Sequence, residues 1–230
     1  MSVNIFDDIG KDKDKEYSSD NHTLFIEDVA EKKILADKDN KLYSFEPKYR
    51  IYRLYIERFF ELKKGLHKVF NQLRQAGNND YIELRISSGG GIIYEGQQFY
   101  NLLQEKFYKR SIAYLDNRGY SMGALLFSMA TKRVIYPHSD FMFHNYSGGA
   151  MGKGHELKAR IKHISKTTKK FFKEIIVDKK FLTKKEFKQM LNGQDFWMDA
   201  KELCQREIAT HVIVNGQEIT AKKYLKMLKK

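Results

Sequence analysis

The sequence predicts an α/β domain whose sheet consists mostly of parallel strands. Two observations indicate this class: short apolar segments of strand period alternate with longer segments of helical period, and glycine-rich turns follow two of the predicted strands. Strand–turn–helix units in succession are typical of parallel sheets covered by helices. In such sheets, sites form at the carboxyl ends of the strands. The two turns, residues 87–91 and 119–123, should therefore lie close together.

The N-terminal quarter of the chain changes character twice. Residues 1–22 are polar and charged without a hydrophobic period, so we expect a flexible tail. We expect residues 23–230 to form a single domain. Within it, residues 23–56 hold short apolar stretches between charged groups, which indicate strands or hairpins. From residue 56 to 73, apolar residues recur mostly at spacings of three and four, which predicts an amphipathic helix.

The middle of the chain repeats one pattern. YIELRI and SIAYLDN have the period of strands, and each is followed by a glycine-rich turn and an apolar helix. RVIYP and DFMFHNY predict two more strands. A long helix follows the glycines at 148–154, and Thr183 with Glu186 forms the capping-box pattern of another helix. Asn215-Gly216 predicts the turn of a closing hairpin.

Composition narrows the function classes. The net charge is +13, but the lysines are spread along the chain and no nucleic-acid motif accompanies them, so we expect no nucleic-acid partner. No apolar run reaches the roughly 18 residues that span a bilayer, and the N-terminus lacks a signal-peptide apolar segment. We therefore expect a cytoplasmic protein. The single cysteine, Cys204, excludes an internal disulfide and a multi-thiolate zinc site, and we expect a packed thiol, no metal and no cofactor.

The segment Gly119-Tyr120-Ser121-Met122-Gly123 fits the pattern G-x-S-x-G. Glycines on both sides of a serine allow a sharp turn from strand to helix, which holds the hydroxyl away from the backbone. The helix that follows directs the positive end of its dipole at the site, which favours developing negative charge. Ser121 is therefore the candidate nucleophile, and the alternative is a structural serine in a glycine turn.

A serine nucleophile needs a base and a group that orients the base. His144 is the first candidate base because it lies where an apolar strand meets a glycine-rich segment, and His211, at the start of another apolar strand, is its rival. Asp195 precedes three large apolar residues, where an unpaired carboxylate would be costly to bury, so it is the candidate orienting group. Asp116 and Asp140 are alternatives in more polar surroundings.

Acyl transfer also needs hydrogen-bond donors for the developing oxyanion. The run Ser88-Gly89-Gly90-Gly91 can bring backbone N–H groups close to a substrate because no side chain blocks the approach. The same glycines could form a phosphate-binding loop, but neither G-K-[ST] nor the Rossmann spacing accompanies them. The run therefore favours an oxyanion site.

Several segments together resemble the ClpP family, the proteolytic subunits of the Clp protease, over roughly residues 50–215. Each segment resembles a family motif, and the motifs follow one another in the family's order. Residues 86–91 resemble the family's I-N-S-P-G-G, with Gly89 in place of the proline, and residues 121–124 are identical to its S-M-G-A. Residues 137–144 resemble its Pro-x-Ser-x-x-Met-x-His, residues 148–152 resemble its G-G-x-x-G, and residues 195–202 resemble its aspartate followed by an aromatic stretch that ends in Ala-x-Glu.

The resemblance implies a crotonase-like, ClpP-type α/β fold of repeated β-β-α units, with the helix at about 155–177 as a protruding handle that joins two rings. It implies stacked heptameric rings that a AAA+ ATPase feeds with unfolded chains. It also implies roles for eight residues: Ser121, His144 and Asp195 as the catalytic triad, the amides of Gly91 and Met122 as the oxyanion hole, and Gly90, Gly148 and Gly149 as substrate contacts.

The leading hypothesis is a serine endopeptidase, with an ATP-independent peptidase core, that hydrolyses unfolded or small proteins within a ring. The N-terminal 50 residues do not resemble the family's axial loops, which meet the ATPase, so a phage-type relative that matures head or scaffold proteins is an alternative. Two others are an α/β-hydrolase esterase that uses Ser121, Asp195 and His211, and a non-enzymatic assembly protein that kept the fold.

Overall fold

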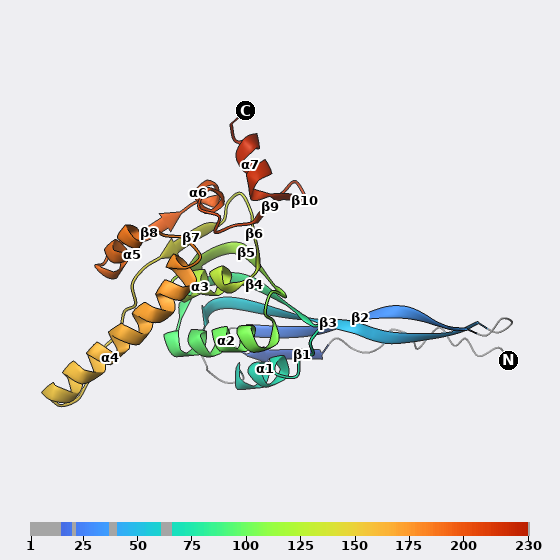
Figure 1. Ribbon diagram of the computed structural model, residues 1–230, viewed down its shortest axis with the longest axis horizontal. Coiled ribbons are helices and arrows are strands. Elements are labelled where there is room, and N and C mark those ends of the chain that lie inside the picture. Colours follow the sequence, from blue (N-terminus) through green and yellow to red (C-terminus); the bar gives the residue numbers. More distant parts are fainter. Residues whose placement is uncertain (1–14, 20–21, 37–40, 61–65, 230) are drawn as a thin grey trace.

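The structure, a computed structural model, describes residues 15–19, 22–36, 41–60 and 66–229. Its centre is a sheet of parallel neighbours in the order β3, β4, β5, β6 and β9 (Figure 1). These strands comprise Lys41–Phe60, Tyr81–Gly91, Ser111–Tyr120, Lys132–Ile135 and His211–Val214. The predicted α/β class is confirmed at this centre, while antiparallel strands extend both edges of the sheet.

Helices follow the strands of the sheet as the sequence pattern predicts. They are α1 (Leu66–Leu73), α2 (Ile93–Lys106), α3 (Met122–Met129), α4 (Gly154–Phe172), α5 (Lys184–Leu191), α6 (Ala200–Gln205) and α7 (Ala221–Met227). Every residue of α3 is buried, as expected of a helix that is apolar all round. α4 passes into a π-helical turn, Lys173–Val177, and its N-terminal end projects from the body (Figure 1). Within the described ranges, none of the helices combines the length and apolar composition needed to cross a bilayer.

A short strand lies within residues 1–22, for which the sequence predicts a flexible tail. Lys15–Ser19 forms β1, which pairs antiparallel with β2 (His22–Ala36). Five residues of mixed polarity carry no strand period of their own, so the sequence could not show this edge strand, which is specified by its partner. Residues 1–14 and 20–21 lie outside the described residues.

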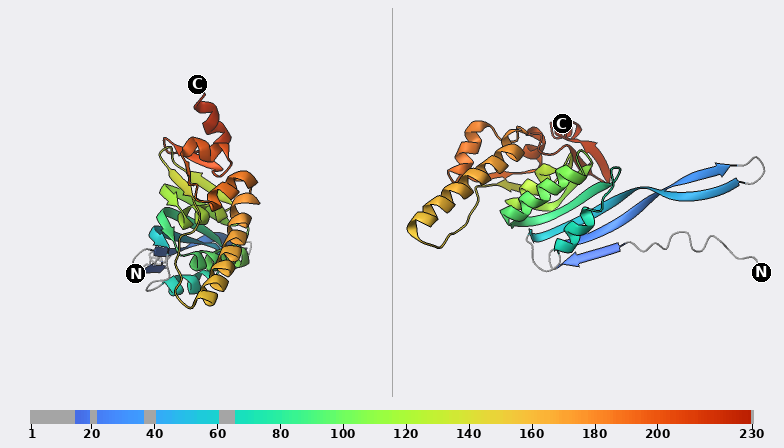
Figure 2. Two further views of the ribbon diagram at one scale, coloured as in Figure 1. Left: turned by 90° about the vertical axis from the view of Figure 1, so that its left-hand side faces the viewer. Right: turned by 60° about the horizontal axis from the view of Figure 1, so that its bottom comes forward.

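The N-terminal strands are far longer than the short stretches expected from the sequence. β2 and β3 form an antiparallel hairpin that extends beyond the body of the domain (Figure 2). The expected helix start at residue 56 is also wrong, because β3 continues to Phe60 and pairs in parallel with β4 up to Gly91. Pairing with a neighbouring strand overrides a short stretch of helical spacing.

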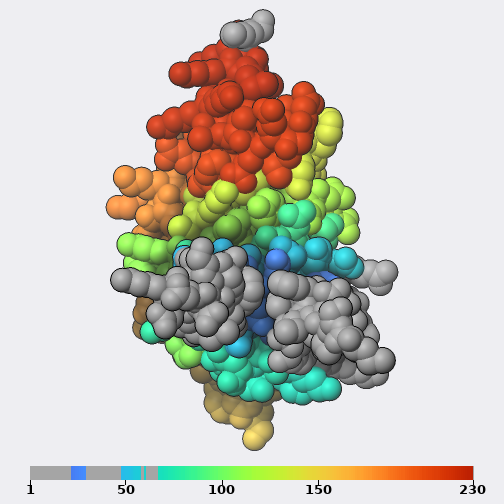
Figure 3. All heavy atoms as spheres, turned by 90° about the vertical axis from the view of Figure 1, so that its right-hand side faces the viewer, coloured from blue at the N-terminus to red at the C-terminus, as the bar shows by residue number. Residues whose placement is uncertain are grey.

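The C-terminal part confirms several local predictions. Thr183 and Glu186 form the capping box of α5. β9 and β10 (Gln217–Thr220) form the closing hairpin, whose turn residues Asn215 and Gly216 have φ values of 50° and 75°. Positive φ at both positions is the type I′ geometry that Asn-Gly favours. This segment gathers at one end of the molecule, drawn in red in Figure 3.

Candidate active site

Ser121 stands between the last residue of β5, Tyr120, and the first residue of α3, Met122. Its backbone has φ 54° and ψ −120°, a conformation that costs a non-glycine residue on the order of 1–3 kcal/mol. The Ser121 N–H donates a hydrogen bond of 3.0 Å to the carbonyl oxygen of Met142, which lies in β7 (Asp140–Phe143). The sharp turn predicted from G-x-S-x-G is therefore confirmed, and a neighbouring strand holds it.

The second glycine-rich turn packs directly against the first. Ser88 of β4 pairs with Gly119 of β5, and a Cβ on Gly123 would come within 2.9 Å of the Ser88 carbonyl oxygen. A Cβ on Gly91 would come within 2.4 Å of the Phe60 carbonyl oxygen. Only glycine fits either position. The prediction that the two turns meet is confirmed.

A small pocket of about 50 Å³ opens at this meeting point. Four of the residues singled out from the sequence line it: Gly91, Ser121, Met122 and His144. Gly90, Gly148, Gly149 and Asp195 are not among the described residues that line it. The pocket thus brings the candidate nucleophile and the candidate base together. The predicted substrate contacts of Gly90, Gly148 and Gly149 stay predictions.

His144 follows the last residue of β7, and its Nε2 atom is buried without a hydrogen-bond partner among the described residues. β7 pairs antiparallel with β8 (Phe196–Met198), and the last pair is Phe143 with Phe196. Continuing this register by one residue sets His144 opposite Asp195. Directly opposite residues have Cβ atoms about 4.5–5.5 Å apart in a regular ladder.

Asp195 itself is exposed, and in the described part of the chain no hydrogen bond joins Ser121, His144 and Asp195. Catalytic hydrogen bonds are often long before substrate binds. The strand register therefore supports the roles of nucleophile, base and orienting group, but the hydrogen bonds that would link these three described side chains are not formed. The triad stays a prediction.

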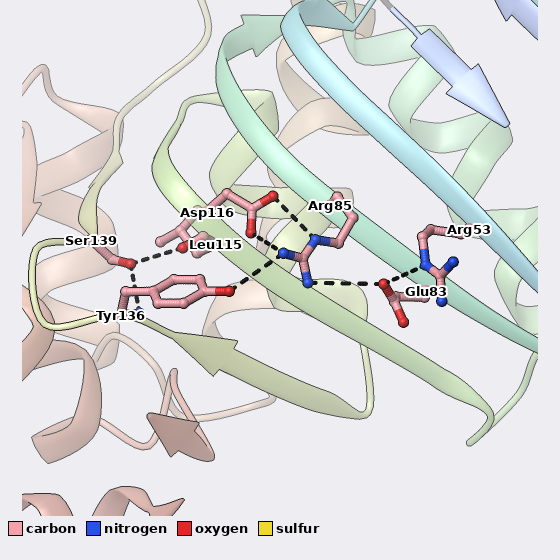
Figure 4. A network of polar contacts seen from close by, with 7 residues as sticks. All are labelled: Arg53, Glu83, Arg85, Leu115, Asp116, Tyr136 and Ser139. Atoms are coloured by element: carbon pink, nitrogen blue, oxygen red, sulfur yellow. Dashed lines mark hydrogen bonds and ion pairs between the residues drawn. The ribbon is translucent and has the colours of Figure 1, made fainter. Parts of the chain in front are cut away.

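The two alternative aspartates already have other partners. Asp116 forms an ion pair of 2.9 Å with Arg85, inside a row of charges that continues through Glu83 to Arg53 on the face of the sheet (Figure 4). Asp140 accepts a hydrogen bond of 2.5 Å from the hydroxyl of Tyr120. Neither carboxylate is bonded to His144, which leaves Asp195 as the best placed of the three.

The rival histidine lies in a different setting. His211 is on β9, where its Nδ1 atom is 2.9 Å from the Thr210 hydroxyl and its Nε2 atom is 4.0 Å from Glu218. It is not among the described residues that line the pocket of Ser121. The esterase hypothesis thus lacks support for its base. His138, His155 and His163 are exposed, as the sequence indicated.

Sequence reasoning missed the apolar and aromatic lining of the pocket. Ile93, Leu125, Tyr146 and Phe172 contribute to it from α2, α3, the segment after β7 and the end of α4. The Tyr146 hydroxyl lies 2.7 Å from that of Ser165, which ties this segment to α4. Only the fold brings these segments together, so no local signal could have found them.

Two further observations concern metals and thiols. Across the part of the chain that the structure covers, no group of three or more His, Cys, Asp or Glu is arranged to hold a metal ion. Cys204 is buried in the core, and burial raises the pKa of its thiol to about 11. The predicted packed thiol is confirmed, and so high a pKa keeps it from acting as a nucleophile near neutral pH.

Comparison with known proteins places this geometry in a family context. The family model described as Clp protease matches residues 49–216. The ATP-dependent Clp protease proteolytic subunit 2 of Chlamydia trachomatis is 30% identical over 142 residues, which cover 60% of this chain and 67% of that protein. The ATP-dependent Clp protease proteolytic subunit of Bacteroides thetaiotaomicron is 28% identical over 138 residues, 58% of this chain and 60% of that protein. The matched span of the family model includes every candidate site residue and leaves β1 and β2 outside.

Proposed function

The chain belongs to the Clp protease family, which makes it a serine-type endopeptidase, and we propose that it cleaves peptide bonds with a triad of Ser121, His144 and Asp195. The observation that carries this assignment is the common pocket of Ser121 and His144. The strained turn at Ser121 supports it, because backbone strain at a non-glycine residue persists where the surrounding structure requires it.

The proposed reaction begins at the hydroxyl of Ser121. Nε2 of His144 accepts the hydroxyl proton as the oxygen attacks the carbonyl carbon of the scissile peptide bond. That nitrogen suits the role because it has no other partner among the described residues. The tetrahedral intermediate collapses, His144 returns the proton to the leaving amine, and an ester to Ser121 remains. Water, activated by the same imidazole, then hydrolyses the ester and releases the new carboxylate.

Asp195 is proposed to hold the imidazole in the tautomer that accepts at Nε2 and to stabilise its charged form. The β7–β8 register supports this role, since it sets the aspartate opposite the histidine. The exposed position of Asp195 leaves its carboxylate free to turn toward the ring when substrate covers the site.

The amides of Gly91 and Met122 are proposed to bind the oxyanion. Met122 is the first residue of α3, and the N–H groups of a helix's first turn have no acceptor inside the helix. Both residues line the pocket beside Ser121. Each such donor is worth about 2.7–4 kcal/mol in the transition state. Gly90, Gly148 and Gly149 are proposed to contact the substrate chain at the rim.

We further propose that the protein works as a ring of identical subunits, heptameric and stacked in pairs, on unfolded or small proteins in the cytoplasm. The projecting end of α4, with its exposed Ile161, suits contact with another copy and hence the role of a handle (Figure 1). The curated relatives are named proteolytic subunits of an ATP-dependent protease, which supports a AAA+ partner. The N-terminal 48 residues fall outside the family match, so maturation of phage head or scaffold proteins is the alternative substrate assignment.

Labelling with a serine-reactive fluorophosphonate tests the nucleophile. We expect the wild-type protein and a Ser165→Ala control to be labelled and Ser121→Ala to remain unlabelled while keeping its circular dichroism spectrum. Equal labelling of Ser121→Ala would refute the assignment. Light scattering on the same samples tests the ring, because a monomeric mass would contradict it without touching the assignment of the nucleophile.

A further inference from the structure

A second hollow, of about 520 Å³, lies at the end of α3 opposite to Ser121. Its walls come from the end of α2, from the residues that follow α3, and from the segment after the π-helical turn. Among the described residues, none that lines it also lines the pocket of Ser121. We refer to it as the α3 hollow. It is a separate site, about 12 Å from the catalytic turn at the rise of an α-helix.

Two partly buried cations, Lys179 and Arg133, line the α3 hollow. The ammonium of Lys179 donates to the carbonyl oxygens of Ser128 and Met129, at 2.6 and 3.2 Å. The guanidinium of Arg133 donates to four carbonyl oxygens, those of Ala130, Thr131, Glu207 and Ile208, at 2.5–3.2 Å. All of these acceptors are neutral backbone groups.

In the described part of the chain, neither Lys179 nor Arg133 forms an ion pair, although the carboxylate of Glu174 acts on Lys179 from a longer distance and Glu207 also lines the hollow. Burial shifts the pKa of both cations. Burial and the nearby Arg133 lower the pKa of Lys179 to about 8, and burial lowers the pKa of Arg133 to about 10. Buried charges in proteins are usually paired, so this pair of like charges calls for an explanation.

A count of donors shows what the two cations leave unused. An ammonium has three N–H donors and a guanidinium has five. Lys179 makes two hydrogen bonds and Arg133 makes four, so each keeps one donor with no acceptor among the described residues. Two spare donors on neighbouring cations match the two oxygens of a carboxylate.

Besides the two cations, the wall of the α3 hollow combines polar residues, among them Gln104 and Glu207, with an apolar and aromatic part. Leu103 and Phe107 of the α2 end are buried in its wall, Phe181 lies 5.2 Å from the Arg133 guanidinium, and Tyr108 is 58% exposed. Ligand sites combine such a lining with a few polar groups that fix the orientation. The hollow therefore offers space for an apolar body next to the two cations.

Stabilisation of the α3 C-terminus explains only part of this arrangement. A cation beside the last carbonyl groups of a helix is favourable, and Lys179 makes those contacts. Arg133, however, donates to the carbonyl oxygens of Glu207 and Ile208, which lie outside the helix. Helix capping also does not explain the one unused N–H donor on each cation, or the open volume beside them. We propose that the α3 hollow binds an organic carboxylate with an apolar or aromatic body, whose carboxylate bridges Lys179 and Arg133. This proposal is independent of the assignment of the triad.

Calorimetric titration of the full chain tests the proposal with three probes: N-acetylphenylalanine, its neutral amide and inorganic phosphate. We expect N-acetylphenylalanine to bind and its amide to give no heat, because the amide lacks the charge. Phosphate should bind more weakly, since it cannot use the apolar wall. Binding of the amide as tight as that of the acid, or of phosphate tighter than N-acetylphenylalanine, would overturn the proposal.

Lys179→Met identifies the site, because it removes the charge and keeps the aliphatic stem. We expect the affinity for N-acetylphenylalanine to fall about tenfold or more, in line with the loss of a charge-assisted hydrogen bond. Lys185→Met, at an exposed position on α5 outside the hollow, should leave the affinity unchanged. Equal affinities of wild type and Lys179→Met would place the probe elsewhere and overturn the proposal.

The wild-type protein alone supplies a second measurement, should Lys179→Met fail to fold. Because the pKa of Lys179 is about 8, the affinity should fall as the pH rises from about 7 to about 9 and the ammonium loses its proton. The other charged groups around it are Arg133 of β6, Glu174 of the π-helical turn, and Lys109 and Glu207 in the hollow wall. An affinity that does not change over this range would overturn the role of Lys179.

Discussion

The backbone N–H of Ser121 donates a hydrogen bond of 3.0 Å to the carbonyl oxygen of Met142. Met142 lies in β7, two residues before His144. One backbone contact therefore ties the turn that carries the hydroxyl to the strand that directly precedes His144. Since backbone groups make this contact, substitutions of the two side chains test their chemistry without removing the frame.

Replacement of His144 by glutamine should abolish most peptide hydrolysis. Loss of the base removes the proton acceptor for the Ser121 hydroxyl, and we expect kcat to fall by at least about 10²-fold. Initial rates with a fluorogenic peptide measure the effect. His211→Gln is the matched control, because His211 lies on β9 outside the pocket. A larger loss with His211→Gln than with His144→Gln would reverse the assignment in favour of the esterase arrangement.

Asp195→Asn should keep the fold and lower kcat, because an amide in place of the carboxylate no longer stabilises the charged imidazole. The expected loss is on the order of 10²–10⁴-fold, with little change in KM. Asp178→Asn, an exposed aspartate near the end of α4, is the control and should retain wild-type kcat. If Asp195→Asn keeps full activity, Asp195 is not the orienting group.

Gly91→Ala should destabilise the fold by about 1–3 kcal/mol, as overpacking of a tight contact usually does. The added Cβ would come within 2.4 Å of the Phe60 carbonyl oxygen, and that backbone group cannot turn aside as a side chain would. Urea unfolding measures the change in the free energy of unfolding. Gly149→Ala is the control for stability, since a Cβ there meets nothing within 4 Å. Equal stability of the two variants would show that the β3–β4 contact is looser than described.

Acid should weaken the C-terminal part of the fold through Glu186. The Arg206 guanidinium, with the Thr183 cap, holds the pKa of this carboxyl at about 2, below its ordinary value of 4.5. A lowered folded-state pKa contributes stability above the unfolded-state value, and this contribution disappears as the pH falls from about 4.5 to about 2. Denaturant unfolding of wild type and Glu186→Gln over this range checks it. The two proteins should converge toward the acid end, and a constant difference would contradict the linkage.

Local sequence signals predicted the site best where the backbone itself is unusual. The turn at Ser121 and the hairpin turn at Asn215-Gly216 both have special backbone angles, and glycine marks both: Gly216 adopts a positive φ, and Gly123 allows the close approach of Ser88. The sequence predicted less well those strands that form only because a neighbouring strand pairs with them. β1 and the end of β3 at Phe60 are strands because a neighbour pairs with them, so composition alone assigned them to a tail and to a helix.

Asp195 illustrates the same limit within the candidate site. Its apolar neighbours singled it out, but only the pairing of Phe143 with Phe196 sets it opposite His144. The residues that line the pocket could not be predicted from the sequence for the same reason, since Leu125 and Phe172 come from different helices and meet only in the fold. The carbonyl contacts of Lys179 likewise depend on the position of a helix end about 50 residues earlier in the chain.

The shortness of β8 has a consequence for how the proposed enzyme would fail. Three residues pair with β7, and in the described sheet β8 has no other neighbour. Opening so small a ladder requires far less free energy than unfolding the whole domain. Such a fluctuation would part Asp195 from His144 while the core around α3 stays intact. Catalytic activity should thus be lost at a lower temperature or denaturant concentration than the one at which the whole domain unfolds.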